Sequence, residues 1–210
     1  YLWMAERWAA GDFGELFAHP FHPLYPFAIG LVLKALPALD SVIAGQLVAS
    51  GCCAFAVVPL WFVTRRLYGD AAATWAAVML AIGTWFVRHP AECMTEGMFQ
   101  LLVLLWAAAL LGTTPRAFLG GLAAGTAFLV RPEGGALALA GMLLLGRRDT
   151  IRAAFVHGVA ALAMALLLPF GSLATGHGFV LSPKAGFSWA DGVGGADSPI
   201  RHYLHHLLAL

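Results

Sequence analysis

The chain alternates between long apolar runs and short polar segments, a pattern typical of a protein that crosses a membrane several times. Residues 42–64 are long enough to cross a bilayer, because a hydrocarbon core ~30 Å thick needs about 20 helical residues. Shorter apolar runs predict further helices at residues 71–87, 97–112, 117–130, 135–146 and 153–170. The pattern predicts an all-α fold, a polytopic transmembrane helical bundle in a single membrane-embedded domain that covers residues 1–210, with its bundle at 42–170.

The two flanks of this bundle have different patterns. Tyr1, Met4 and Trp8 stand at helical spacing among charged residues, which predicts an N-terminal interfacial helix, although an ordinary packing helix fits the same pattern. Three prolines in residues 19–26 exclude a regular helix there, and residues 24–39 predict a half-inserted helix, so that 1–41 forms an external amphipathic segment. Residues 171–200 are rich in Gly, Ser, Asp and Pro and predict an external loop.

Two polar segments interrupt the apolar runs. The first polar segment is W-F-V-R-H-P-A-E-C-M-T-E-G at residues 85–97, and the second is R-P-E-G at residues 131–134. A helix over residues 117–130 covers only about 21 Å, so Arg131 and Glu133 are expected below the membrane surface. An Arg at that depth costs about 2.5–3.5 kcal/mol and usually faces a cavity and a partner. The alternative is a structural ion pair of Arg131 with Glu96 or Glu92.

Composition supports the membrane class and excludes others. The chain is 60% hydrophobic and 11% charged, whereas soluble domains average roughly 25% charged residues. A net charge of +1 gives no reason to expect a nucleic-acid partner. The three cysteines form neither a disulfide framework nor a paired metal motif.

Charge density predicts the orientation. Six cations lie in three short loops, and the other six are spread over longer segments; the first set is Arg65, Arg66, Arg116, Arg147, Arg148 and Arg152. The positive-inside rule gives most weight to short loops. Both polar segments are therefore expected to face the periplasm or exterior of a bacterial-type cytoplasmic membrane.

Several motifs in order resemble the membrane glycosyltransferases of the GT-C superfamily. They are W-A-A-G-D at 8–12, P-L-Y-P at 23–26, T-R-R-L-Y-G at 64–69, M-T-E at 94–96 and L-V-R-P-E-G at 129–134. The chain is most similar to the bacterial branch related to protein O-mannosyltransferases and lipid A aminoarabinose transferase. This resemblance implies transfer of a sugar from a polyprenyl-phosphate carrier to a lipid, glycan or protein acceptor on the outer face.

The resemblance also implies roles for individual residues. Glu96 resembles the second acidic site residue of the family, Arg131 a cation that contacts the carrier phosphate, and His22 a basic residue before the proline-rich turn. Tyr1 resembles a Tyr that follows the catalytic acidic pair, so we interpret the chain as a fragment. Its first span, the loop with the catalytic Asp and the C-terminal part are expected to lie outside it.

The residue types suit this chemistry. Arg binds phosphate through forked, charge-assisted hydrogen bonds, which makes Arg131 and Arg88 candidates for the donor phosphate. Glu96 and Glu92 are the candidate catalytic carboxylates, because a carboxylate takes or orients the proton of an acceptor hydroxyl. Glu133, His89 and Tyr25 are candidate supporting residues. A divalent metal ion stays open, since His and Glu side chains gather here without a fixed metal-binding spacing.

Two other functions fit part of the pattern. A transporter or flippase would use the Arg and Glu residues as a substrate or proton path. No pair of matching repeats with interrupted helices supports that reading. A structural membrane subunit without chemistry would leave the charged residues between apolar runs without a reason. The prediction is therefore a polyprenyl-phosphate-sugar-dependent glycosyltransferase.

Overall fold

The computed structural model describes residues 1–17, 21–83, 88, 92–112, 114–148 and 151–177. Within these ranges every regular element is helical, which confirms the predicted all-α fold. The elements in chain order are α1 (Leu2–Ala9), a 3₁₀ turn (Phe13–Leu16), α2 (Leu24–Ala35), α3 (Ser41–Tyr68), α4 (Asp70–Ile82), α6 (Glu96–Leu110), α7 (Ala117–Phe128), α8 (Gly134–Arg148), α9 (Ile151–Ala165) and α10 (Leu167–Ala174).

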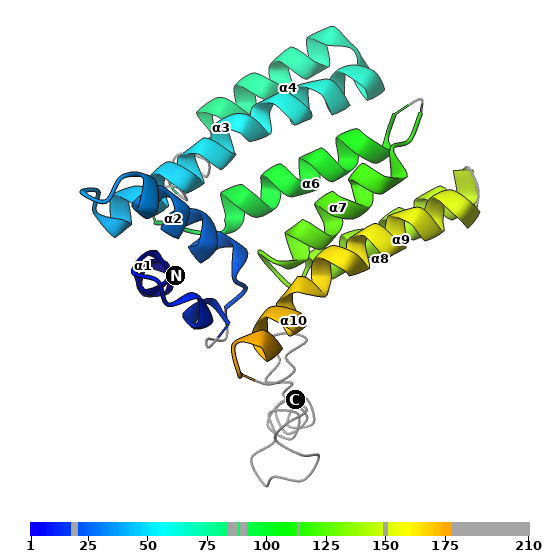
Figure 1. Ribbon diagram of the computed structural model, residues 1–210. Helices are drawn as coiled ribbons and strands as arrows, with labels where there is room; N and C mark the ends of the chain where they lie inside the picture. Colours follow the sequence, from blue (N-terminus) through cyan, green and yellow to red (C-terminus); the bar gives the residue numbers. More distant parts are fainter. Residues whose placement is uncertain (18–20, 84–87, 89–91, 113, 149–150, 178–210) are drawn as a thin grey trace, which may run out of the picture.

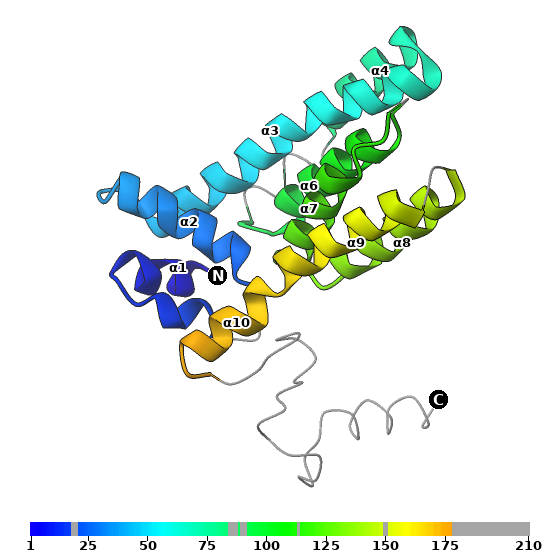
Figure 2. The ribbon, with the colours of Figure 1, turned by 45° about the vertical axis from the view of Figure 1, so that its right-hand side comes forward.

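The longer helices form a bundle of roughly parallel and antiparallel rods (Figure 1). The pairs α3–α4, α3–α6, α6–α7 and α7–α9 pack along their lengths, and α8 packs against both α7 and α9. Helices α1 and α2 lie together at one end of the bundle, where the N-terminus is found, as both views show (Figures 1 and 2). This N-terminal unit therefore covers a single end of the bundle.

Two helical stretches, Ser41–Tyr68 and Ile151–Ala174, are long and apolar enough to cross a membrane. Helices α2, α4, α6, α7 and α8 are apolar but shorter. The outer surface carries exposed large apolar side chains, among them Phe55, Trp75, Leu143 and Phe155, each about two-thirds exposed. A soluble monomer rarely exposes such a surface, whereas lipid-facing helices do so by necessity.

Helix boundaries follow the local chemistry of the chain. Helix α3 is capped at its start by Asp40, whose side chain accepts hydrogen bonds from the N–H groups of Val42 at 2.8 Å and Ile43 at 3.4 Å. It ends at Gly69, which has a φ of 88° that other residues rarely adopt, and the chain turns directly into α4. The helix predicted at residues 153–170 corresponds to α9 and α10, which continue to Ala174. The first residues of the predicted loop at 171–200 are therefore helical.

Two glycines on one face of α7 let it approach α9 closely. A Cβ atom at Gly121 would lie 2.3 Å from the carbonyl oxygen of His157, and one at Gly125 would lie 2.4 Å from that of Ala161. Small residues four positions apart allow this backbone contact between membrane helices. The contact fixes α7, and with it the segment that follows, against the rest of the bundle.

The N-terminal helix packs against the protein. Met4, Ala5 and Trp8 are buried, and a Cβ atom at Gly30 of α2 would lie 2.1 Å from the Trp8 ring. The ammonium of Lys34, in the last turn of α2, lies over that ring at 4.2 Å from its centroid. These contacts show that α1 packs on α2, and its place at a membrane interface stays a prediction.

Candidate functional site

The predicted site residues are carried by the end of the bundle that α1 and α2 cover. Because successive helices run in opposite directions, the start of α6, the end of α7 and the start of α8 meet there (Figure 1). One core cluster connects these ends to the N-terminal unit; its buried members are Ala5, Tyr25, Ile29, Leu33, Ala44, Ala49, Met98 and Val130. The fold thus brings the two polar segments to one packed end.

Arg131 connects these two polar segments. Its Nη1 donates to Glu96 Oε1 at 2.8 Å, across 35 positions of the sequence. Its Nη2 and Nε donate to the two carboxylate oxygens of Glu133 at 3.0 and 3.4 Å. The hydrogen bond to Glu133 raises the pKa of Arg131 above its ordinary value, so the guanidinium keeps its charge. The sequence had left Glu96 and Glu92 open as partners, and the ion pair forms with Glu96.

Glu96 is held at a fixed place by the packing of α6 on α3. The next residue, Gly97, lies so close to α3 that a Cβ atom there would be 2.7 Å from Cys53 Sγ and 3.0 Å from the Ala49 carbonyl oxygen. The Oε2 atom of Glu96 is buried and accepts no hydrogen bond from the described residues. A buried polar atom left unsatisfied costs roughly 1–3 kcal/mol, more when it is charged. Such a group in a native protein calls for an explanation.

Tyr1 lies at the same site. Its ring packs against Phe21 at 4.8 Å and edge-on against Tyr25 at 5.4 Å between centroids. Burial raises the pKa of the Tyr1 phenol, and its hydrogen bond with the Thr95 side chain opposes that shift; Glu96 raises the pKa further. In the sequence Tyr1 was only a landmark for the family resemblance. Its contact with the turn before Glu96 has no signature in the sequence.

Tyr25 and His22 are buried supports of the same end. The Tyr25 hydroxyl donates to the Gly45 carbonyl at 3.1 Å and connects α2 to α3. The His22 ring is 1% exposed and packs perpendicular to Phe128, three residues before Arg131. The Leu24 N–H donates to the Leu129 carbonyl at 3.1 Å, so the proline-rich turn is joined to the end of α7. The role of His22 with a phosphate stays a prediction, and its ring offers almost no surface in this conformation.

Arg88 and Glu92 form a separate ion pair of 2.7 Å in the first polar segment. The Arg88 side chain is 76% exposed, and the hydrogen bond to Glu92 raises its pKa. Cys93, next in the chain, has a φ of 52°, a left-handed conformation that is uncommon for a residue with a side chain. This turn separates Glu92 from Glu96. His89 lies outside the described residues, so its predicted supporting role has no structural counterpart here.

The charges of this site set a condition on its chemistry. Arg131 pairs with both Glu96 and Glu133, and these three side chains carry one positive and two negative formal charges. A phosphate that binds to Arg131 must compete with at least one of these carboxylates. The guanidinium has five N–H groups, and the bonds described use three of them. In the part of the chain that is described, no three His, Cys, Asp or Glu side chains gather as metal ligands.

Comparison with known proteins identifies the family. The family described as dolichyl-phosphate-mannose-protein mannosyltransferase matches residues 18–172, about three-quarters of the chain. The match includes the described parts of both polar segments and helices α2 to α9. No curated protein and no solved structure gives a significant match. The chain therefore belongs to the dolichyl-phosphate-mannose-protein mannosyltransferase family, which is of the GT-C glycosyltransferase type.

Proposed function

We propose that the protein transfers a sugar from a polyprenyl-phosphate carrier to an acceptor on the outer face of the membrane. Within a glycosyltransferase family, one observation supports this site above all: the Arg131–Glu96 pair with the unsatisfied Glu96 Oε2. A pair that served packing alone would be expected to satisfy both carboxylate oxygens. The unsatisfied Oε2 atom of Glu96 can accept a hydrogen bond from a substrate.

In the proposed reaction Arg131 binds the phosphate of the donor. When the glycosidic bond breaks, the bonding electrons stay with the phosphate oxygen and negative charge grows there. A fixed guanidinium stabilises this charge more in the transition state than in the ground state. Glu133 orients the guanidinium through its two hydrogen bonds. A bound phosphate would partly replace the Glu133 carboxylate as the anion beside Arg131.

Glu96 is proposed to orient the acceptor. Its Oε1 stays with Arg131, while Oε2 accepts a hydrogen bond from the acceptor hydroxyl that attacks the sugar. Tyr1 lies beside it, so a carboxylate that precedes Tyr1 in the chain, as the family resemblance predicts, would enter the same site. That carboxylate would take the acceptor's proton. Helices α6 and α7 are shorter than a full membrane span, which supports a site that reaches a carrier whose isoprenoid chain stays in the bilayer.

The test separates a catalytic pair from a packing pair. In the intact protein, Arg131→Met with Glu96→Leu replaces the two charges by apolar side chains of similar volume, a change that often leaves stability unaltered. We expect correct membrane insertion and at least about a 100-fold loss of sugar transfer from a polyprenyl-phosphate donor, the scale for removal of a transition-state hydrogen-bond donor.

One single variant and a control complete this test. Glu96→Gln keeps the shape of the side chain and is expected to lose transfer while the protein stays folded. Arg147→Gln removes an exposed Arg from the opposite end of α8 and is expected to retain full transfer. Full transfer by the Arg131→Met/Glu96→Leu protein would assign the pair to packing and remove the proposed site.

A further inference from the structure

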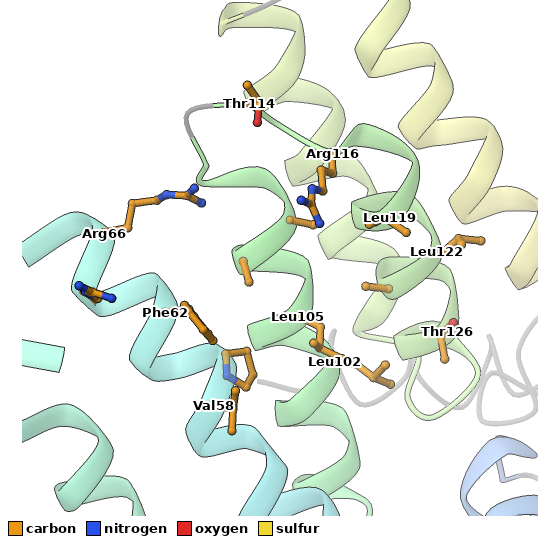
Figure 3. A pocket seen from close by; sticks show the side chains of 15 residues that line it. Val58, Phe62, Arg66, Leu102, Leu105, Thr114, Arg116, Leu119, Leu122 and Thr126 are labelled. Atoms are coloured by element: carbon orange, nitrogen blue, oxygen red, sulfur yellow. The ribbon is translucent and has the colours of Figure 1, made fainter. Parts of the chain in front are cut away.

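A groove runs along α6, and its cationic end lies at the end of the bundle opposite the Arg131 site. It runs between α3 and α7 over the surface of α6 and has a cavity volume of about 1060 Å³, at the upper end of the ~300–1,000 Å³ typical of ligand pockets. Figure 3 shows Arg66, Arg116 and Thr114 at one end and Val58, Leu102 and Thr126 at the other. The groove thus has a cationic end and an apolar floor.

The walls between these two ends are apolar. Helix α7 contributes Leu119, Leu122 and Thr126, which share one helix face and extend about 10 Å at 1.5 Å per residue. Phe62 of α3 and Leu105 of α6 form the facing walls. A groove of this length and composition takes a hydrocarbon chain.

The cations at the groove end are not neutralised by the described part of the protein. Arg65 pairs with Asp70 at 2.5 Å, but neither Arg66 nor Arg116 has an ion pair with any described residue. The Arg66 guanidinium lies beside Gly112, where a Cβ atom would be 2.7 Å from its Nη1. The nearby C-terminus of α6 supplies about half a negative charge, against two full positive charges.

We propose that this groove binds an anionic diacyl phospholipid, with its phosphate between Arg66 and Arg116 and an acyl chain along α6 and α7. Charge complementarity selects this occupant, because Arg binds phosphate through forked hydrogen bonds and the anionic headgroup lies at the depth of the helix ends. An uncharged lipid or an apolar helix would contact the apolar walls but would leave both guanidinium groups without an anionic partner. The site is separate from Arg131 and Glu96, and its proposal does not depend on sugar transfer.

The experiment measures lipid retention by the purified chain in detergent by native mass spectrometry. We expect phosphatidylglycerol to bind at least about 10-fold more tightly than phosphatidylcholine of the same acyl chains. Arg66→Gln with Arg116→Gln should reduce phosphatidylglycerol binding to the phosphatidylcholine level. The charge-matched control, Arg147→Gln with Arg152→Gln, removes two exposed arginines of the same end that do not line the groove and should retain the preference.

Two further measurements distinguish a phospholipid from a phosphate without acyl chains. Ala123→Phe fills the groove and keeps both arginines, so it should weaken phosphatidylglycerol binding at least about 10-fold. Glycerol 3-phosphate, which has the phosphate without the chains, should not displace the lipid. Equal binding of the two lipids, an unchanged preference in the Arg66/Arg116 variant, or displacement by glycerol 3-phosphate would overturn the proposal. So would a groove that retains polyprenyl phosphate and no phosphatidylglycerol.

Discussion

At the scale of single residues, the site depends on one guanidinium that two carboxylates share. Arg131 supplies hydrogen bonds to Glu96 and Glu133 at once, and one oxygen of Glu96 is left buried without a bond from the described residues. The neighbouring phenols are better satisfied, since the Tyr25 hydroxyl donates to Gly45 and Tyr1 shares a hydrogen bond with Thr95. In this respect Glu96 Oε2 differs from both phenols.

Tyr25→Phe should lower the free energy of unfolding by about 1–2 kcal/mol, because the Gly45 carbonyl loses its buried donor. Burial raises the pKa of the Tyr25 phenol above its ordinary value near 10. The stabilisation from the neutral phenol is thus complete below pH 10 and is lost as the pH rises towards the folded-state pKa. Unfolding in SDS at pH 8 and at pH 11 measures both effects. A variant whose stability equals that of the wild type at pH 8 would contradict this role of the hydroxyl.

At the scale of elements, the position of Arg131 depends on the contact between α7 and α9. Gly121 and Gly125 bring the two backbones together, and Arg131 follows three residues after the end of α7. A shift of α7 would therefore move the guanidinium away from Glu96. Glu96 is placed in a similar way by the contact of Gly97 with α3.

Gly125→Leu should destabilise the protein by at least about 2 kcal/mol and reduce sugar transfer, because an added side chain meets the α9 backbone. The matched control is Gly51→Leu in α3, where an added Cβ meets no atom within 4 Å. We expect the control to keep both its stability and its transfer activity. The comparison uses SDS unfolding and transfer assays on the intact protein. Equal stability of the two variants would show that the α7–α9 contact is not tight.

At the scale of the whole molecule, the helix directions separate two chemically different ends. One end carries Glu96, Arg131 and Glu133, and the other carries Arg66, Arg116 and Arg147. With the positive-inside rule, we propose that the first end faces the periplasm or exterior. The donor site and the proposed phospholipid site would then serve opposite leaflets.

Cysteine labelling in intact cells tests this orientation. In a background with Cys52, Cys53 and Cys93 replaced by Ala, Met94→Cys should react with a membrane-impermeant maleimide added outside. Thr114→Cys, at the other end, should react only after the membrane is permeabilised. The reverse pattern would invert the protein and place the Arg131 site in the cytoplasm.

The sequence by itself determined the class of this protein and most of its helices. Apolar runs at 42–64, 97–112 and 117–130 correspond closely to α3, α6 and α7, since hydrophobic length and polar interruptions are local properties. The same pattern singled out Arg131 and Glu96 as residues that need a partner, and the order of the motifs indicated the family that the comparison then showed. Of the predicted external loop at 171–200, residues 178–200 lie outside the described ranges.

Only the tertiary structure decided which charges meet. The choice of Glu96 over Glu92 as the partner of Arg131 depends on how α6, α7 and α8 pack, and sequence distance carries no record of that packing. The same holds for Tyr1 beside Thr95, for the packing of α1 on α2, and for the groove that ends at Arg66 and Arg116. Each of these features joins residues that are far apart in the sequence, and such contacts depend on how the helices pack rather than on any local pattern.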